Sequence, residues 1–328
     1  MDTYTPIQLP YFAPAEQLPA PLPTFEEILS SEKIIDGDVD GRRISRVGEH
    51  FVVKFGKLVH LKEGENMLFV KSNTSLFVPS VYALYQCENE GVQYKVIVTE
   101  YVPGTYLSLM IGDENEEGEF DEDEEGKFDE DEERKIGKEE REAITTQLRA
   151  YIDELRRIPP ADYFGVLGGR LYCKEFGGPF NSAEAARDSI FRSLVDDFDN
   201  GGWGDEHLLR PYKEKRELAC SQFSRGHGVS NVPVFSHGEL TPGNIIVRPD
   251  GTVYLVEWQT AGFYPAEYEH VSAKILDNML PNPMWAEMIP KFLDCYADNL
   301  ESFEGLEREY ERYRALESNY KRDTVITK

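Results

Sequence analysis

The chain has 328 residues, of which 40% are hydrophobic and 12% aromatic, and it carries a formal net charge of −26. This length is enough for the core of one large domain or two smaller ones. The negative excess argues against nucleic acid and anionic membranes as partners, because both require a basic binding surface. The sequence contains no run of about 18 apolar residues, so no transmembrane helix is expected. The N-terminus also lacks a basic stretch followed by an apolar one, so a cytoplasmic location is expected, with the nucleus as the alternative.

Residues 1–24 contain six prolines and few charges. Such a composition predicts an extended N-terminal arm, which we expect to be mobile. The segment FEEILSS that follows predicts a short helix and begins an N-terminal lobe over residues 25–101.

This lobe has mostly the pattern of β-strands. The segment ISRVGEHFVVKFG alternates and turns at Gly48-Glu49, which predicts a hairpin with Phe51 to Phe55 as its second strand. Residues Glu63 to Ser72 switch to helical spacing, and two further strands, VYALYQC and VQYKVIVTEYV, flank the turn ENEG. We therefore predict a mostly antiparallel sheet with one helix inserted after the third strand.

Residues 112–138 form an acidic segment that nearly repeats itself. Between Asp113 and Glu133 there are 15 acidic residues and one basic residue, which account for more than half of the net charge. A segment of this composition cannot bury enough apolar surface to order itself, so we predict a disordered insertion. It is either a solvated loop with no role or a binding tail for a basic protein partner.

The second half, residues 102–318, has mostly helical patterns and is followed by a tail, residues 319–328. From Lys138 to Ile158 the apolar positions Ile144, Leu148, Ile152 and Leu155 predict an amphipathic helix that ends before two prolines. Further helices are predicted over residues 183–198, 205–222 and, as two or three segments, 266–317. The strand-rich front and helix-rich back predict an α+β protein of two lobes.

One short segment concentrates polar groups that suit catalysis. SHGELTPGN, residues 236–244, precedes a predicted hairpin, IIVRPDGTVYLVEW, whose second strand ends just before Glu257. The hairpin should bring Glu239, Asn244 and Glu257 to one edge of a small sheet. Carboxylate and amide oxygens suit Mg²⁺ with substrate phosphates, and a separate carboxylate can accept a hydroxyl proton. Alternatively, Glu239 and Asn244 only shape a turn, and Glu257 lies on a surface strand end.

The order His-Gly-acid-Leu-x-Pro-Gly-Asn, a hairpin and acid-Trp resembles the aminoglycoside phosphotransferase and choline kinase family. The resemblance implies a protein-kinase-like fold, with a small antiparallel β-sheet lobe and a larger helical lobe. It implies an ATP- and Mg²⁺-dependent transfer of phosphate to a hydroxyl of a small molecule. In that reaction Glu239 would be the catalytic base, Asn244 and Glu257 would bind the metal, and His237 would brace the loop.

The front half carries the same resemblance. FVVKFG resembles the strand whose lysine pairs with nucleotide phosphates, which would be Lys54. The helix GENMLFV offers Glu65 as the ion-pair partner of Lys54, with Glu63 as the competing choice. VTEYVPG resembles the hinge between the lobes, and AGFYPAEYE resembles the segment after the metal site in fungal-type members. The hinge implies that adenine would bind the backbone of Glu100, Tyr101 and Val102. The turn RVGEH, with one glycine, provides no full glycine-rich loop.

Two residues depart from the family pattern. Glu239 and Glu257 stand where the family has aspartates. The added methylene extends each side chain by about 1 Å, and a misplacement of that size can lower a rate about a hundredfold. The alternative function is therefore a catalytically impaired pseudokinase that serves as a nucleotide-binding or scaffold module. Acidic residues of the second lobe, Glu267, Glu269 and Asp277, either face a cationic acceptor or stand there by chance.

Overall fold

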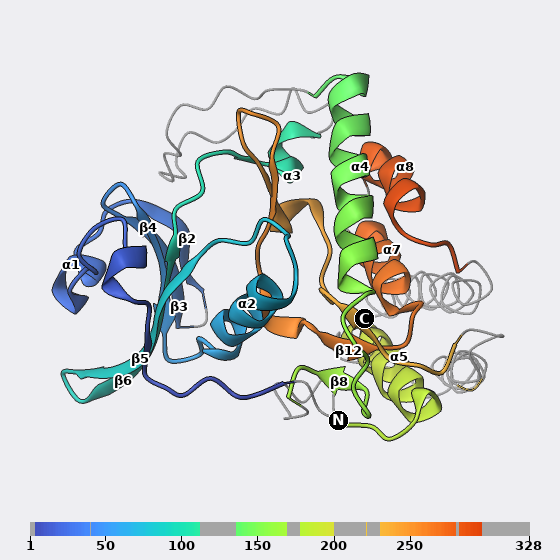
Figure 1. Ribbon diagram of the computed structural model, residues 1–328, viewed down its shortest axis with the longest axis horizontal. Helices are drawn as coiled ribbons and strands as arrows, with labels where there is room; N and C mark the ends of the chain where they lie inside the picture. Colours follow the sequence, from blue (N-terminus) through green and yellow to red (C-terminus); the bar gives the residue numbers. More distant parts are fainter. Residues whose placement is uncertain are drawn as a thin grey trace, which may run out of the picture.

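The computed structural model describes residues 4–39, 41–111, 136–168, 178–199, 221, 230–279 and 282–296 (Figure 1). Its N-terminal part is a six-stranded antiparallel sheet in the order β1-β5-β6-β4-β3-β2. The strands are β1 (Tyr11–Phe12), β2 (Ile34–Val39), β3 (Arg42–Val47), β4 (Phe51–Gly56), β5 (Val81–Asn89) and β6 (Val92–Glu100). The predicted hairpin is β3–β4, and the later strand pair is β5–β6. The sequence prediction missed β2, because its glycine and aspartates lower its β-propensity.

Side chains of β4 alternate between the two faces of the sheet. Phe51, Val53 and Phe55 are buried in a core cluster with Val96 and Val98 of β6. Helix α1 (Phe25–Leu29) covers this cluster, and its Thr24 forms a capping box with Glu27. Because successive side chains of a strand point to opposite faces, Lys54 lies on the other face. The hydrophobic pattern of β4 thus sets the direction of its lysine.

From Tyr4 onward the N-terminal segment is part of the fold, whereas a mobile arm over residues 1–24 was expected. Strand β1 pairs with β5, with Tyr11 opposite Leu84, and a 3-10 turn, η1 (Ala15–Gln17), follows it. Tyr4 and Ala13 are buried in the two main core clusters. The apolar residues between the prolines explain this packing, and an edge position tolerates proline, which lacks a backbone donor.

Helix α2 (Lys62–Asn73) follows β4 and joins the sheet to the rest of the molecule. Met67, Phe69 and Val70 are buried in a cluster that also contains Phe235 and Trp258 from the C-terminal half. The helix therefore packs between the sheet and the C-terminal part, as Figure 1 shows. Its position depends on both halves of the chain.

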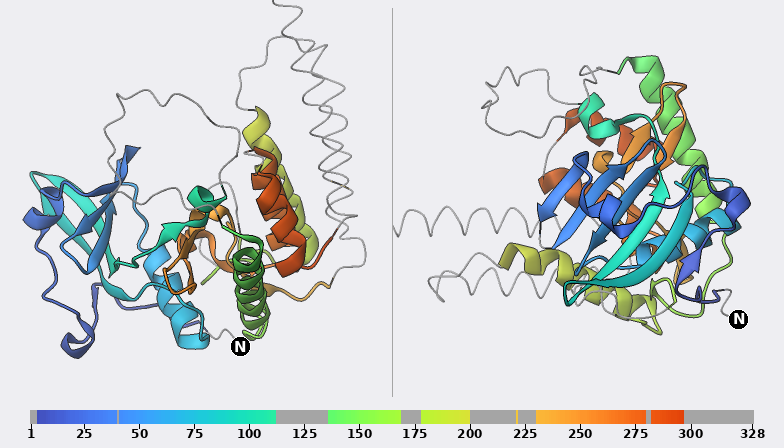
Figure 2. Two further views of the ribbon diagram at one scale, coloured as in Figure 1. Left: turned by 90° about the horizontal axis from the view of Figure 1, so that it is seen from above. Right: turned by 90° about the vertical axis from the view of Figure 1, so that its left-hand side faces the viewer.

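The C-terminal half consists of helices around two small antiparallel sheets, β11-β10-β7 and β8-β12-β9. The strands are β7 (Thr105–Tyr106), β8 (Gly165–Val166), β9 (Val234–Ser236), β10 (Ile245–Val247), β11 (Val253–Leu255) and β12 (Gly262–Tyr264). The helical segments are α3 (Leu107–Met110), α4 (Lys138–Leu155), α5 (Ala183–Asp199), η2 (Pro242–Asn244), η3 (Trp258–Thr260), α7 (Tyr268–Met279) and α8 (Pro283–Phe292). In the left view of Figure 2 the large sheet lies on one side and these helices on the other, and in the right view the sheet faces the viewer with helices behind it.

Several sequence predictions can be compared directly with these elements. The four apolar positions predicted for α4 are all buried. The predicted hairpin IIVRPDGTVYLVEW is β10–β11, with Ile245 opposite Leu255. The α+β architecture of two lobes is confirmed. The acidic segment, the helix predicted over 205–222 and the chain beyond residue 296 lie outside the described residues, apart from isolated positions at their edges. Among the helices that are described, none is long and apolar enough to cross a bilayer.

Candidate active site

The loop between β9 and β10 presents Glu239. The chain turns at Gly238, whose φ is +94° and where a Cβ atom would lie 2.8 Å from Thr260 Oγ1. Only glycine fits this combination of backbone angle and close approach. Glu239 follows at once, and η2 then leads through Asn244 into β10.

A buried carboxylate on α7 holds this loop. Glu269 accepts hydrogen bonds from the backbone nitrogens of His237, at 2.7 Å, and Gly238, at 3.0 Å. The Tyr268 hydroxyl and Ser272 Oγ donate to the carbonyl of Gly238 at 3.1 and 3.2 Å. The sharp turn before Glu239 thus has its buried backbone groups paired, as a buried loop requires.

His237 connects the loop to the end of β11. Its Nδ1 accepts from the Glu239 backbone nitrogen at 3.3 Å, so its Nε2 carries the hydrogen and donates to the carbonyl of Val256 at 2.9 Å. Its ring lies 4.5 Å from that of Trp258. The residue binds neighbouring backbone, which is the bracing arrangement that the resemblance implied.

Lys54 lies between two carboxylates. Its Nζ is 2.6 Å from Glu63 Oε2 and 2.8 Å from Glu257 Oε2, and its side chain is 7% exposed. Glu65, the first choice for this pairing, instead contacts the Tyr4 hydroxyl at 2.6 Å and Lys62 at 3.3 Å. Residues two apart on a helix point to different sides, so only one of the two glutamates can face β4. The structure therefore corrects the partner from Glu65 to Glu63.

Burial and charge determine the proton affinity of this cluster. Burial alone lowers the pKa of Lys54, but Glu63 and Glu257 outweigh it and raise the pKa overall. Burial and the negative charge of Glu257 raise the pKa of Glu63 to about 7, although Lys54 opposes that shift. One cation shared by two carboxylates leaves a net negative charge, which favours taking up a proton.

Glu257 adopts a left-handed backbone, with φ 61° and ψ 56°. This conformation costs a non-glycine residue roughly 1–2 kcal/mol, so the surroundings must hold it. Asn66 of α2 contributes by donating from Nδ2 to the carbonyl of Trp258 at 2.7 Å. Helix α2 thus holds Lys54 through Glu63 and also holds the segment that carries Glu257.

Asn244 lies beside the same strand end. Its carbonyl accepts from Val256 N at 3.0 Å, and its side-chain nitrogen donates to the carbonyl of Glu239 at 2.8 Å. Because the side-chain nitrogen is a donor and is already bound to Glu239, the side-chain amide oxygen of Asn244 is the atom that could bind a cation. Among the described residues, no cluster of three or more His, Cys, Asp or Glu side chains is arranged to hold a metal. A site with one amide and one carboxylate fits Mg²⁺ that keeps phosphate and water ligands.

Glu239 belongs to the same electrostatic region. Burial raises the pKa of its carboxyl group, and the charge of Glu257 adds to the rise, while His237, Gln259 and Lys54 oppose it. Gln259 Nε2 lies 3.5 Å from Oε2, a long and weak contact. A carboxylate in these surroundings binds protons more strongly than an exposed glutamate, which suits a group that accepts a proton.

The segment that resembles a hinge follows β6. The backbone nitrogens of Glu100 and Tyr101 donate to the carbonyls of Ser80 and His50, each at 2.8 Å. Val102 is buried against Ile246 and Tyr254 of the C-terminal half. The backbone nitrogens of Glu100 and Tyr101 are thus engaged in hydrogen bonds within the fold. A ligand at this segment would contact its backbone carbonyl groups or the Val102 nitrogen.

The sequence prediction missed a turn next to Lys54. Strands β2 and β3 are joined around Gly41, and this turn folds over Gly56, where a Cβ atom would lie 1.9 Å from the Gly41 carbonyl oxygen. Gly56 pairs with Arg42 and stands two residues after Lys54. The two glycines of GDVDG were the available signal, but neighbouring aspartates concealed the strand that precedes the turn.

The acidic residues considered for a cationic acceptor have structural partners instead. Glu267 and Glu269 are fully buried; Glu267 forms an ion pair with Arg187, and Glu269 holds the loop that carries Glu239. Asp277 is 7% exposed and contacts Lys274 and the Asn282 backbone. Each of these three carboxylates therefore has at least one partner within the fold.

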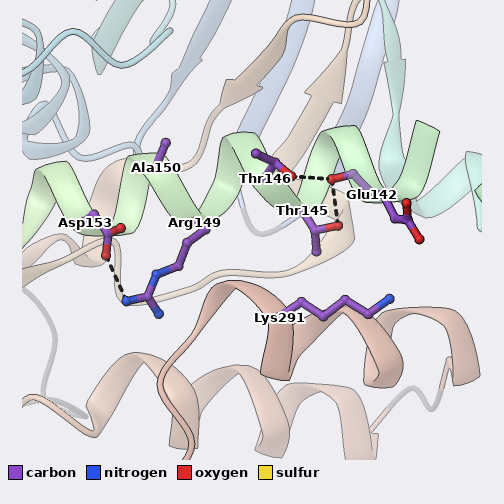
Figure 3. Close-up of a pocket in the computed structure, with 7 residues that line it drawn as sticks. All are labelled: Glu142, Thr145, Thr146, Arg149, Ala150, Asp153 and Lys291. Atoms are coloured by element: carbon purple, nitrogen blue, oxygen red, sulfur yellow. Dashed lines mark hydrogen bonds and ion pairs between the residues drawn. The ribbon is translucent and has the colours of Figure 1, made fainter. Parts of the chain in front are cut away.

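A groove between α4 and α8 has a volume of about 510 Å³. Figure 3 shows its lining and the ion pair between Arg149 and Asp153. The lining residues are Glu142, Thr145, Thr146, Arg149, Ala150, Asp153 and Lys291. None of them belongs to the Lys54 cluster or to the loop that carries Glu239, so the groove is separate from the candidate active site.

No family model matches the sequence, and no curated protein matches it. Solved structures do match. A thermostable mutant of aminoglycoside phosphotransferase APH(4)-Ia, without ligand, is 12% identical and aligns over 90% of this chain and 92% of its own, with a TM-score of 0.55. This chain has the aminoglycoside phosphotransferase fold.

Two further solved structures match this chain. A mutant of the same enzyme in a ternary complex with ADP and hygromycin B is 12% identical, covers 90% and 91% of the two chains, and gives a TM-score of 0.53. The choline kinase LicA from Streptococcus pneumoniae is 15% identical over 90% and 89%, with a TM-score of 0.45. The assignment of the phosphotransferase fold rests on the first two comparisons, because the third TM-score is low.

Proposed function

We propose that the protein is an ATP- and Mg²⁺-dependent phosphotransferase that acts on a hydroxyl group of a small molecule. The observation that carries the proposal is Lys54, held between Glu63 and Glu257 beside the loop of Glu239 and Asn244. The fold supports it, because a structure of the same fold contains ADP and hygromycin B. We also propose that the protein acts in the cytoplasm or the nucleus.

Lys54 would bind the α- and β-phosphates of ATP. Its pKa is raised, so it carries its charge throughout the physiological range. Glu63 is buried and keeps Lys54 in place, whereas Glu257 is more exposed, with a side chain that is 24% exposed. Phosphates would therefore replace Glu257 at Lys54, and adenine would contact the backbone of Glu100, Tyr101 and Val102.

Glu257 and Asn244 would hold Mg²⁺ through a carboxylate and an amide oxygen. The bound ion would neutralise negative charge on the transferring phosphate. Because these residues supply few ligands, the ion is expected to bind together with the nucleotide. Magnesium alone should bind weakly.

Glu239 would accept the proton of the acceptor hydroxyl. As the hydroxyl oxygen bonds to the γ-phosphorus, the bond from that phosphorus to the β,γ-bridging oxygen breaks, and ADP leaves. The products are a phosphate ester and ADP, and the proton resides on Glu239. The glutamate must reach the attacking oxygen within hydrogen-bonding distance.

The acceptor would be a small molecule with a hydroxyl group. A cationic acceptor would contact residues other than Glu267, Glu269 and Asp277, which have partners within the fold. The test is calorimetry of ATP binding with and without Mg²⁺, followed by a phosphate-transfer screen with aminoglycosides, choline and other amino alcohols. Magnesium-dependent ATP binding and a phosphorylated product would support the proposal. Tight ATP binding with no transfer to any hydroxyl would contradict an enzymatic role.

The second candidate is a pseudokinase, favoured by the glutamates at both acidic positions. Such a protein would bind nucleotide and act as a scaffold. The double substitution Glu239→Asp and Glu257→Asp separates the two functions. A gain in rate of orders of magnitude would identify the natural site as impaired, whereas a loss would show a site adapted to glutamate.

The acidic segment, with a basic protein as its proposed partner, would be tested by a salt-sensitive pulldown with residues 113–133 deleted.

A further inference from the structure

The N-terminal segment extends from the sheet past α2 to the region of β8 (Figure 1). Tyr4, near its start, is 9% exposed. Its ring meets Phe69 edge-on, with centroids 6.0 Å apart. A segment expected to be mobile therefore places an aromatic side chain against the helix that carries Glu63.

The Tyr4 hydroxyl is bound to two charged side chains of α2. It donates to Glu65 Oε2 at 2.6 Å and accepts from Lys62 Nζ at 2.9 Å. Lys62 Nζ also lies 4.3 Å from the centre of the tyrosine ring. Lys62, Glu65 and Phe69 are three and four positions apart, so they form one face of the helix. Tyr4 thus holds a face of α2 different from the one that carries Glu63.

On its other side Tyr4 touches the C-terminal half. A Cβ atom at Gly168 would lie 2.7 Å from Tyr4 Cε1, so this glycine allows the ring to approach. The Gly168 nitrogen donates to the Tyr163 hydroxyl at 2.7 Å, and Tyr163 meets Phe263 of β12 edge-on. The tyrosine is therefore placed between α2 and the loop after β8.

We propose that Tyr4 is a positioning residue that holds α2 in the orientation in which Glu63 binds Lys54. The proposal rests on the proposed function, because the Lys54–Glu63 pair matters for nucleotide chemistry. Asn66 holds the same helix through the Trp258 carbonyl. Helix α2 is thus fixed from two sides, and loss of the Tyr4 contacts would let its N-terminal turns shift and separate Glu63 from Lys54.

The test compares Tyr4→Phe and Tyr4→Ala with Tyr11→Phe, a matched control in the same segment. Two measurements use the full chain without nucleotide. The first is hydrogen exchange of the α2 amides, and the second is the acylation of Lys54 by a small amine-reactive acylating reagent, with Lys71 as internal reference. The exchange rate of the α2 amides and the acylation rate of Lys54 should both rise about tenfold in Tyr4→Phe, because the Tyr4 hydroxyl, which this variant lacks, bonds to charged groups. Tyr11→Phe should behave like the unchanged protein.

Steady-state kinetics provide the third measurement. In an active enzyme, kcat should fall about tenfold in Tyr4→Phe at temperatures well below its melting point, with little change in KM for the acceptor. Unchanged α2 exchange and Lys54 acylation in both Tyr4 variants would overturn the proposal, and so would an unchanged kcat. If the unchanged protein transfers no phosphate, the proposed function fails, while exchange and acylation still decide the role of Tyr4.

Discussion

At the scale of single residues, the Lys54 cluster makes stability depend on pH. The pKa of Glu63 is raised to about 7 in the folded protein, above its ordinary value of 4.5. The folded state therefore binds more protons than the unfolded state between these values. The contribution of Glu63 to the free energy of unfolding is lost as pH rises from about 4.5 to about 7, with a total of roughly 3 kcal/mol.

We therefore predict that Glu63→Gln flattens the decline in stability between pH 5 and pH 7 in nucleotide-free protein. Urea unfolding at a series of pH values measures the effect. The matched control is Glu287→Gln, because the side chain of Glu287 is 70% exposed. An equal pH dependence in Glu63→Gln and the unchanged protein would contradict the assignment.

A second residue-scale prediction concerns Glu239, the proposed catalytic base. Because burial raises the pKa of Glu239, activity should decline on acidification at a pH above the ordinary glutamate value. Glu239→Gln should lower kcat by roughly 10²–10⁴ and remove that acidic decline. The pH profile of kcat checks both effects. A fully active Glu239→Gln enzyme would exclude Glu239 as the base.

At the scale of elements, α7 supports the loop that carries Glu239 through one carboxylate, that of Glu269. Glu269→Ala would leave the buried nitrogens of His237 and Gly238 without their acceptor, at a cost of about 2–4 kcal/mol of stability. Activity should fall even in molecules that remain folded, because the loop also presents Glu239. Chemical unfolding and kcat well below the melting temperature measure the two effects separately. Stability and kcat both equal to those of an exposed control, Glu287→Ala, would contradict this role.

At the scale of the whole molecule, nucleotide should stabilise the contact between the sheet and the C-terminal half. Lys54 and Glu257 come from these two parts and meet at 2.8 Å. The phosphates at Lys54 and the Mg²⁺ at Glu257 would bridge the two parts in place of this direct contact. ATP with Mg²⁺ at about 100 times its Kd should add about 2.7 kcal/mol, or several degrees in Tm. Lys54→Met should remove most of that shift. Thermal unfolding with ATP, Mg²⁺ or both measures it, and an equal shift in Lys54→Met would place the nucleotide elsewhere.

The sequence by itself determined several local elements and the polar side chains of the loop that carries Glu239. Alternation in β4 and the spacing of apolar residues in α4 depend only on neighbouring residues, so the hairpin and the helix could be predicted. The order of Lys54, Glu239, Asn244 and Glu257 along the chain was enough to predict the phosphotransferase fold.

The tertiary structure decided what depends on contacts between distant segments. Glu63 and Glu65 are equally plausible in the sequence, and only the rotation of α2 against β4 selects Glu63. The packing of the N-terminal segment depends on β5 and α2, which no local pattern within residues 1–24 reveals. The sequence left open whether Glu267 and Glu269 face a cationic acceptor or stand there by chance. In the structure partners far along the chain bury them, because a buried carboxylate is stable only with compensating donors.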